Sequence, residues 1–379
     1  MTMHFKLLPA KQKYSPMILH VISDFTMPNG AERMLIRLLN HGEHERAVVA
    51  PMVGMTESNC NLVTNPLVRF EFLDTQSPRS IFKAVAKLRR LIIEERPTAI
   101  LCWMYHAMVV GTIAQRMSAP QMPVYWNVRQ SLDDPSSLSR STRRAVAACK
   151  LLSRFPRATI YNSQRALDLH LQYGFRDNRS IVIPNGFELP GSVTIRPGQA
   201  TTFGIAGRQH PQKDFRTFFN AAAQVAQKNP NVRFVVAGLD NTKDNPEVMS
   251  MIAEAGLPLQ QVELLGPVSD ISGFYRSIDM LILSSRTEGF PNVVAEAMSH
   301  GRPVITTDVG DAAAIVGDSG IVVPPRDVDA LRVAIEQAID FSPQDYVDRA
   351  EKARARIGSV YSIASIAGQY REILKPGPA

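Results

Sequence analysis

Two glutamates flank the predicted start of a helix late in the chain. Glu288 precedes a Gly-Phe-Pro-Asn loop, and Glu296 lies one turn inside a helix that begins near Asn292. Unpaired amide groups and the positive dipole at a helix N-terminus attract phosphate oxygens. A carboxylate on the polar face of that helix accepts hydrogen bonds from sugar hydroxyls. Residues 288–296 therefore predict a site for a ligand with phosphates and hydroxyls, although the dipole alone also favours acids near a helix start.

Two cations follow the strand predicted at residues 202–206. Arg208 and Lys213 come after Gly207, with four residues between them, so both can face the same phosphates. A leaving diphosphate gains negative charge as its bond to a sugar breaks, and fixed cations stabilise that charge. Solvated loop cations are the alternative for this pair taken alone. The neighbouring prediction for Glu288 favours the phosphate role.

Three further positions lie in segments that follow predicted strands of the first half. Gly30 precedes a predicted helix, where the absence of a side chain lets a ligand approach the backbone. Its loop, Met-Pro-Asn-Gly, lacks the G-x-G-x-x-G pattern of dinucleotide sites, and an ordinary turn is the alternative. His106 closes a Trp-Met-Tyr-His run, and Arg129 closes a Trp-Asn-Val-Arg run. A lone histidine at such a position is often structural.

Short β-branched runs alternate with longer amphipathic runs, which is the pattern of parallel sheets flanked by helices. Residues 189–200, rich in Pro and Gly, are predicted to form a linker. The predicted fold class is α/β, with two doubly wound, Rossmann-like domains that bind ligands at the carboxyl ends of their strands, facing a cleft. The expected strands are residues 18–23, 47–53, 70–73, 99–103, 124–127, 159–162 and 180–183 in the first half, and 202–206, 233–237, 262–265, 280–284, 303–306 and 320–323 in the second.

Composition restricts the class of protein. The 379 residues favour two domains, and three widely spaced cysteines give neither a disulfide framework nor a zinc site. We expect a cytoplasmic protein, because no apolar run approaches the length of a membrane span and residues 1–15 lack the apolar stretch of a signal peptide. Asp327-Val328-Asp329 is a D-x-D string, but its place at a predicted helix start indicates capping, and we expect no metal site.

Lys and Arg outnumber Asp and Glu in the first half, and the net charge of the whole chain is +7. Much of the positive charge falls in two amphipathic segments, residues 79–96 and 140–157. They are either solvated helix faces or surfaces that attract anionic lipid headgroups or a lipid diphosphate. Nucleic acid is not expected as a partner, because these segments contain no recognised binding module.

Six segments, in order, resemble the retaining glycosyltransferases of the GT-B fold, specifically family 4, over nearly the whole chain. They are Asn29-Gly30-Ala31-Glu32-Arg33, Trp103-Met104-Tyr105-His106, Trp126-Asn127-Val128-Arg129-Gln130-Ser131, Ile183-Pro184-Asn185-Gly186, Gly207-Arg208-Gln209-His210-Pro211-Gln212-Lys213 and the segment from Arg286 to Met298. Family members often carry two adjacent glycines where Asn29-Gly30 stands. In many relatives a histidine stands at the position of Arg129.

The resemblance implies a division of roles. Residues 1–190 would form an acceptor-binding domain with His106 and Arg129 on the acceptor side, and residues 191–361 a donor-binding domain; residues 362–379 would cross back to the first domain. Glu288, Arg208, Lys213 and His106 are the implied catalytic residues. The implied donor-binding set is Gly30, Arg208, Lys213, Glu288, Gly289, Phe290, Pro291, Asn292, Val293 and Glu296.

The predicted function is retaining, metal-independent transfer of a hexose-type sugar from a nucleoside-diphosphate sugar, which is a substrate, with no cofactor. We expect the acceptor to be a saccharide or a lipid-linked oligosaccharide for surface polysaccharide, met at the inner face of the membrane. Two alternatives remain open at this point. One is a nucleotide-sugar epimerase of the same architecture, and the other is a non-catalytic nucleotide-sugar-binding subunit.

Overall fold

The computed structural model describes residues 16–27, 29–42, 45–75, 80–133, 135, 138–177, 179–195, 198 and 200–375. The chain divides into two compact units: unit 1 comprises Met1–Gly186 and Ile366–Ala379, and unit 2 comprises Phe187–Ser365. The sequence expectations for residues 1–15 and for Arg79 lie outside the described residues. Within the described ranges, no helix combines the length and the apolar character needed to cross a membrane.

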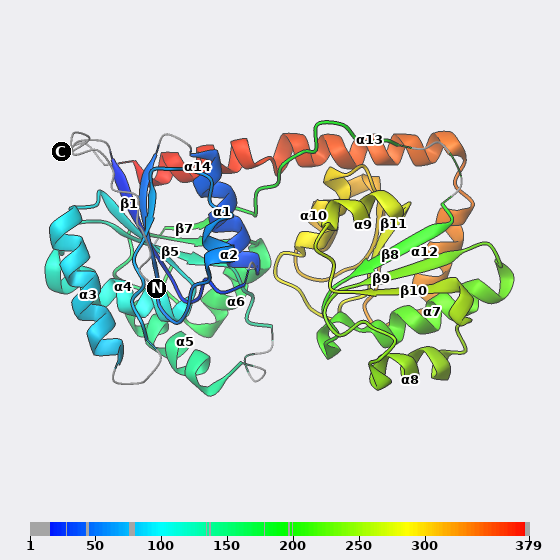
Figure 1. The fold of residues 1–379 in the computed structure, drawn as a ribbon, viewed down its shortest axis with the longest axis horizontal. Coiled ribbons are helices and arrows are strands. Elements are labelled where there is room, and N and C mark those ends of the chain that lie inside the picture. The colour runs from blue at the N-terminus through cyan, green and yellow to red at the C-terminus, as the bar shows by residue number, and fades with distance from the viewer. Residues whose placement is uncertain are drawn as a thin grey trace. The chain divides into compact units, whose positions relative to one another are not determined.

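A parallel sheet of seven strands forms the centre of unit 1, in the order β3-β2-β1-β4-β5-β6-β7 (Figure 1). Its strands are β1 (Met17–Ile22), β2 (Arg46–Pro51), β3 (Val68–Phe70), β4 (Ala99–Trp103), β5 (Val124–Val128), β6 (Ala158–Tyr161) and β7 (Ser180–Val182). Its helices are α1 (Gly30–His41), α2 (Glu57–Cys60), α3 (Ser80–Glu95), α4 (Tyr105–Ser118), α5 (Arg140–Leu152), α6 (Gln164–Tyr173) and most of α14 (Ile363–Leu374).

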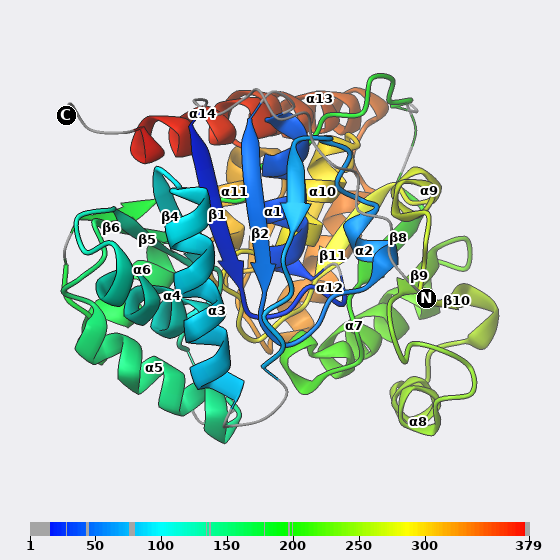
Figure 2. The same ribbon diagram turned by 60° about the vertical axis from the view of Figure 1, so that its left-hand side comes forward.

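The sheet of unit 1 is covered on both faces. On β1, Met17, Leu19 and Val21 join a core with residues of α3, α4 and α5. Because successive side chains of a strand alternate in direction, Ile18 and His20 face the other side. That side is covered by α1 and α14, and Figure 2 shows α14 close to the start of β1.

Unit 2 contains a parallel sheet of six strands in the order β10-β9-β8-β11-β12-β13. The strands are β8 (Thr202–Ala206), β9 (Arg233–Ala237), β10 (Val262–Gly266), β11 (Met280–Leu283), β12 (Val304–Thr307) and β13 (Ile321–Val323). The α-helices are α7 (Phe215–Lys228), α8 (Pro246–Ala255), α9 (Ile271–Ser277), α10 (Asn292–Ser299), α11 (Ala312–Val316), α12 (Val328–Ile339) and α13 (Pro343–Val360).

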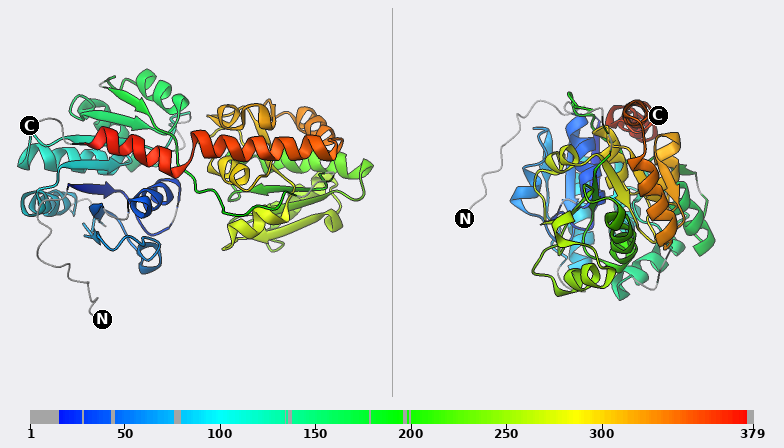
Figure 3. Two further views of the ribbon diagram at one scale, coloured as in Figure 1. Left: turned by 90° about the horizontal axis from the view of Figure 1, so that it is seen from above. Right: turned by 90° about the vertical axis from the view of Figure 1, so that its right-hand side faces the viewer.

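Two apolar cores hold unit 2 together, one on each face of the sheet. Phe203 and Ile205 of β8 pack with residues of α7, α8 and α12. Ala206 and the alternate residues of β9 and β11 pack with α9, α10, α11 and α13. Helix α13 lies against α10 (Figure 3). The chain therefore forms two doubly wound α/β units, which confirms the predicted fold class.

The predicted strands agree in number with the two sheets and differ at some ends. β3 ends at Phe70, whereas the sequence predicted a strand at residues 70–73. The short helices α2 and α9 were not predicted, because helices of four and seven residues leave too little periodicity to detect. Asp327 is the N-cap of α12, and its Oδ1 accepts a hydrogen bond from Ala330 N (2.9 Å), so the capping interpretation of this residue is confirmed.

Candidate functional site

The loop that follows β8 brings Lys213 back over the end of the sheet. Gly207 N donates a hydrogen bond to Ala237 O (2.9 Å), so β8 and β9 stay joined beyond their last residues. Gly238 has a φ of +128°, and a Cβ at this position would lie 1.9 Å from Gly207 O; only glycine fits there. The 3-10 turn Pro211–Lys213 then places the side chain of Lys213 over Gly207. Arg208 is exposed, and within the described part of the chain it has no hydrogen-bond partner.

Three hydrogen bonds join this loop to the loop between β11 and α10. Arg286 N donates to Gln212 O (2.8 Å), and Gln212 Nε2 donates to Thr287 O (2.8 Å). Ser284 Oγ, directly after β11, donates to Lys213 O (2.9 Å). The backbones on both sides of Lys213 are therefore tied to the segment that carries Glu288.

The buried Asp214 forms an ion pair with the exposed Arg286 between the same two loops. Its Oδ1 lies 2.9 Å from Arg286 Nη2, and its Oδ2 accepts a hydrogen bond from Thr217 Oγ1 (2.8 Å). Burial alone would raise the pKa of Asp214, but the hydrogen bonds from Arg286 and Thr217 outweigh burial and hold its pKa below the ordinary value. Asp214 stays ionised at neutral pH, so the ion pair that ties the two loops persists.

Lys213 and Glu288 form an ion pair at the centre of the site. Lys213 Nζ lies 2.5 Å from Glu288 Oε1, and Ser285 Oγ donates to the same oxygen (2.7 Å). The side chains are 22% and 11% exposed, so both are largely shielded and still reachable by a ligand. An ammonium group has three N–H donors, and this contact uses one of them. Lys213 can therefore bind a phosphate oxygen while it remains paired with Glu288.

The backbone after Glu288 is held by a second loop of unit 2. Asp311 N donates to Gly289 O (3.1 Å). Gly310 has a φ of +54°, and a Cβ there would lie 2.4 Å from Gly289 O and 2.5 Å from Glu288 O. The two loops are thus in backbone contact. Phe290, in contrast, is buried and stacks on Phe187 (6.0 Å between ring centroids), so its ring anchors the segment in the core.

Helix α10 begins at Asn292 after Pro291, the N-cap residue, and no side chain caps its first amide groups. Glu296 lies one turn inside the helix and is 9% exposed. Tyr275 OH donates to Glu296 Oε2 (3.1 Å), which fixes one of the two carboxylate oxygens. Val293 is only partly buried and packs at the edge of the core beside the helix start. The site thus combines a helix N-terminus, an oriented carboxylate and a nearby ammonium group.

In unit 1, Gly30 is the first residue of α1 and follows Asn29, whose side chain makes no capping hydrogen bond. Glu32 lies in the first turn, is 8% exposed, and its Oε2 has no hydrogen-bond partner in the part of the chain described. Burial raises the pKa of Glu32 to about 7, with a further contribution from the nearby Asp24. The sequence placed this residue in a family segment but gave it no role of its own.

His106 is the second residue of α4, at the end of β4. The preceding Met104 has a φ of +69°, a strained conformation for a residue with a side chain, which permits the abrupt change from strand to helix. His106 is partly buried, and burial lowers the pKa of its imidazole ring. A neutral ring at pH 7 is able to accept a proton.

Arg129 is held at the end of β5 by aromatic rings and neutral oxygens. Its guanidinium carbon lies 5.6 Å from the ring centre of Trp103 and 5.7 Å from that of Tyr370. Nη1 donates to Ile183 O (3.1 Å) and to Asn185 Oδ1 (2.9 Å). Nε and Nη2 are buried and have no hydrogen-bond partner among the described residues. Burial lowers the pKa of Arg129 to about 9, so the group remains a cation at neutral pH without a carboxylate partner.

Comparisons with known proteins cover most of these elements. The family called Glycosyltransferase Family 4 matches residues 28–189, and the family called Glycosyl transferases group 1 matches residues 200–340. The chain belongs to the glycosyltransferases. The crystal structure of Anabaena HepE in complex with UDP has 25% sequence identity and a TM-score of 0.80, over 94% of this chain and 99% of that chain. This likeness assigns the chain to the GT-B fold.

Among curated proteins, the alpha-D-kanosaminyltransferase of Streptomyces kanamyceticus is 29% identical over 175 residues, which cover 44% of this chain and 44% of that protein. The O-antigen chain mannosyltransferase B of Escherichia coli is 30% identical over 137 residues, 35% of each protein. The matched segments therefore span less than half the length of these two relatives.

Several residues of this candidate site were not predicted from the sequence. Gln212, Asp214 and Arg286 join the two loops, Ser285 binds Glu288, and Tyr275 binds Glu296. Ser285 carried a weak signal, because it follows the end of a predicted strand beside the glutamate. Tyr275 lies on α9, a helix that the sequence did not predict. In the described ranges no group of His, Cys, Asp or Glu side chains could hold a metal ion.

Proposed function

We propose that this glycosyltransferase moves a hexose-type sugar from a nucleoside-diphosphate sugar to an acceptor hydroxyl, with retention of the anomeric configuration. The observation that carries the proposal is the Lys213–Glu288 ion pair beside the start of α10. It combines a fixed cation for a diphosphate with a carboxylate for a sugar. HepE, a structural neighbour, was crystallised with UDP and with UDP-glucose.

In this proposal the protein stabilises the departing diphosphate without a metal ion. Lys213 and Arg208 supply positive charge, and the N-terminus of α10, which no side chain caps, supplies the positive end of its dipole and amide donors to phosphate oxygens. Glu296, held by Tyr275, binds the ribose hydroxyls. Glu288 approaches the transferred sugar. In a same-face reaction the departing phosphate oxygen takes the acceptor proton, so retention needs no separate base.

We further propose that the acceptor is a lipid-linked oligosaccharide met at the inner face of the membrane. Helices α3, α4 and α5 pack side by side in unit 1 (Figure 1). They expose apolar side chains, with Phe82 79% and Leu151 76% exposed. Arg90, Arg143 and Arg144 are exposed on the same helices. Apolar side chains among cations suit a surface of anionic lipids.

The acceptor side of the reaction falls to His106 and Arg129 in this proposal. His106 is neutral at pH 7 and able to hydrogen-bond a hydroxyl group. Arg129 presents a cation whose Nε and Nη2 lack partners among the described residues, which suits an anionic group of a lipid-linked acceptor. The relatives named as mannosyltransferases of O-antigen and lipopolysaccharide core support a hexose and a polysaccharide product.

The test is incubation of the purified protein with UDP-, GDP- and ADP-sugars and a panel of polyprenyl-diphosphate-linked acceptors. We expect release of one nucleoside diphosphate, and proton NMR of the product should show the anomeric configuration of the donor. Activity should persist in EDTA. An inverted product would contradict retention, and no diphosphate release from any pair would contradict the proposal. A changed sugar without any acceptor would indicate epimerisation instead.

A further inference from the structure

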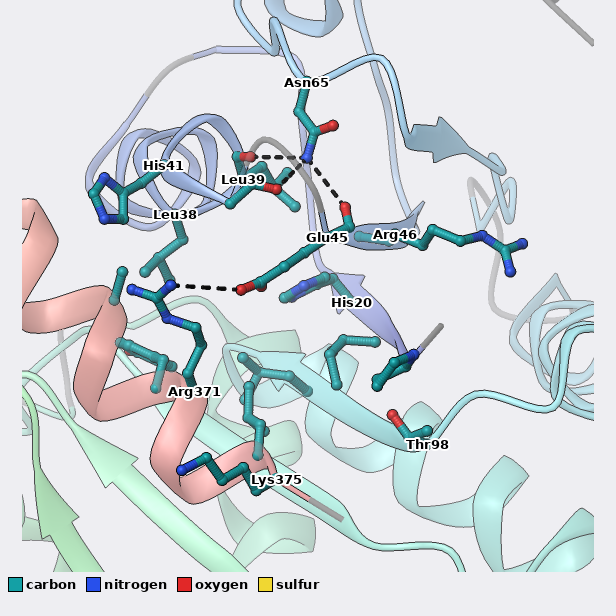
Figure 4. Close-up of a pocket in the computed structure, with 18 residues that line it drawn as sticks. His20, Leu38, Leu39, His41, Glu45, Arg46, Asn65, Thr98, Arg371 and Lys375 are labelled. Atoms are coloured by element: carbon teal, nitrogen blue, oxygen red, sulfur yellow. Dashed lines mark hydrogen bonds and ion pairs between the residues drawn. The ribbon is translucent and has the colours of Figure 1, made fainter. Parts of the chain in front are cut away.

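Unit 1 contains a cavity of about 300 Å³ on the sheet face that α1 and α14 cover. This volume lies at the lower end of the range found for small-molecule sites. Its walls come from the end of α1, one side of α14, and residues of β1, of β4 and of the start of β2 (Figure 4). The walls are mainly apolar, and the apolar residues include Ile18, Leu38, Leu39, Leu101, Ala367 and Leu374. The sheet's larger core lies on the opposite face.

His20 places one polar group in this apolar surface. The residue is 6% exposed, and its Nδ1 accepts a hydrogen bond from Trp103 Nε1 (3.2 Å). Burial lowers the pKa of His20 to about 3, so the ring is neutral and its single proton is on Nε2. Nε2 has no hydrogen-bond partner among the described residues, and His20 lines the cavity. An oxygen of an occupant, or a water bound with it, would satisfy this donor.

Charged side chains surround the cavity at the start of the strands. Arg46, Arg371 and Lys375 line it, together with one carboxylate, Glu45. Arg371 Nη1 lies 3.8 Å from Glu45 Oε1, and these side chains are 50% and 53% exposed. A long, exposed pair of this kind contributes little and is easily replaced by another anion. Lys375 Nζ is paired in the same exposed way with Glu372 Oε2 (2.5 Å), so both cations at the end of α14 can exchange their carboxylate partners for another anion beside the apolar walls.

We propose that this cavity binds an anionic amphiphile, a single alkyl or prenyl chain that ends in a carboxylate or a phosphate. The hydrocarbon chain of the ligand would lie between α14 and the sheet, against Leu38, Leu101 and Leu374. The anionic group would bind Arg371 and Lys375 at the end of α14. Neither the comparisons nor the donor site described above assigns a ligand to this place, and the proposal does not depend on the sugar donor.

An occupant would also contact the supports of Arg129. Tyr370 lines the cavity, its hydroxyl accepts a hydrogen bond from Asn127 Nδ2 (3.0 Å), and its ring lies 5.7 Å from the Arg129 guanidinium. His20 holds Trp103, whose ring is the other neighbour of that guanidinium. The ligand would therefore contact Tyr370 directly and Trp103 only through His20, and both aromatic rings neighbour the Arg129 guanidinium.

Isothermal titration calorimetry of the full-length protein tests the proposal, with dodecanoate and dodecyl phosphate below their micelle concentrations and dodecanol below its solubility limit. We expect one site per chain, with at least one of the two anions bound tenfold or more tightly than dodecanol. A preference for the carboxylate would identify a fatty acid as the source, and a preference for the phosphate a lipid phosphate. If the cavity buries the whole alkyl chain of the ligand, removing one methylene group from that chain should weaken binding about fourfold. Equal affinity for dodecanol would overturn the anionic assignment.

Two variants locate the site. Ala367→Trp places an indole in the cavity and should weaken all three ligands at least tenfold, whereas Gln369→Trp, an exposed position of the same helix, should leave them unchanged. The double variant Arg371→Glu and Lys375→Glu changes exposed residues only, so we expect it to fold. It therefore tests the proposal even if Ala367→Trp does not fold. It should weaken the anions at least tenfold and leave dodecanol within twofold. No binding of either anion, or unchanged binding in the double variant, would overturn the proposal.

Discussion

Lys213 Nζ lies 2.5 Å from Glu288 Oε1, although 75 residues separate them in the chain. The contact joins the loop after β8 to the segment before α10, and Ser285 Oγ donates a hydrogen bond to the same carboxylate oxygen. A cation and a carboxylate so placed limit each other's freedom before any ligand arrives. Preorganised groups stabilise developing charge without reorganisation during the reaction.

Lys213→Ala should lower kcat/KM for the sugar donor by about 10²- to 10³-fold, the usual effect of removing one fixed charge donor at a transition state. The free energy of unfolding should fall by about 1 to 3 kcal/mol, because the largely shielded Glu288 carboxylate loses its cation and keeps only the hydrogen bond from Ser285. Steady-state kinetics and urea unfolding measure the two effects. Lys243→Ala, at an exposed position of unit 2, is the matched control and should behave as the wild type. Wild-type kinetics in Lys213→Ala would remove this residue from the mechanism.

Glu288→Gln keeps the shape of the side chain and removes its charge. Turnover should fall by about 10²-fold if the carboxylate stabilises the transferred sugar in the transition state, whereas donor binding should change much less. The comparison of kcat with a donor dissociation constant from calorimetry separates these effects. Loss of binding with unchanged kcat would show that Glu288 serves only as a binding residue.

Tyr275→Phe removes the hydroxyl group that binds Glu296 Oε2 at 3.1 Å. The loss of one hydrogen bond to a charged group should weaken donor binding by about 1.5 to 3 kcal/mol, or roughly 10- to 150-fold, with a smaller effect on kcat. Tyr361→Phe is the matched control, because its hydroxyl binds Ala314 O in the same unit at a longer 3.4 Å. A Tyr275→Phe enzyme with the wild-type KM for the donor would contradict the positioning role.

The sequence predicted the parts of the site that depend on local pattern. Residue types alone predicted the strand that ends before Gly207 and the helix that follows Pro291. Both elements, β8 and α10, lie where they were expected. The resemblance then selected Lys213 and Glu288 from many charged residues. Their contact itself was beyond sequence reasoning, because the distance between two loops depends on how the strands of the sheet are ordered.

The residues that the sequence missed act through long-range contacts. Asp214 and Arg286 pair across 72 positions, and each alone resembles an ordinary loop residue. For Arg129 the sequence predicted the position but not the surroundings. Its place at a strand end was predicted, but its enclosure by Trp103 and by Tyr370 of the last helix depends on the return of the chain to unit 1.

Gly310→Ala should displace the backbone next to Glu288. Its φ of +54° disfavours alanine, and the new Cβ would lie 2.4 Å from Gly289 O. Gly256 is the matched control: its φ is +69°, but a Cβ at this position would have no atom within 4 Å. An alanine there would be strained in its backbone without a steric clash. Gly256→Ala should therefore cost about 1 kcal/mol of stability, and Gly310→Ala distinctly more together with a large loss of turnover. Equal effects on stability and activity would show that the backbone contact does not position Glu288.

Glu32 should make the stability of unit 1 fall as the pH rises. Burial raises its pKa from 4.5 to about 7, so between these values the folded chain holds a proton that the unfolded chain has released. The loss develops from about pH 4.5 to 7, is complete above pH 7, and has an upper limit of about 3 kcal/mol. Glu32→Gln should be more stable than the wild type at pH 8 and similar at pH 4. Glu57→Gln changes an exposed residue of α2 and is the control, for which we expect no gain in stability at pH 8. Urea unfolding at both pH values measures the difference, and an equal pH dependence in wild type and Glu32→Gln would show that this carboxyl group titrates normally.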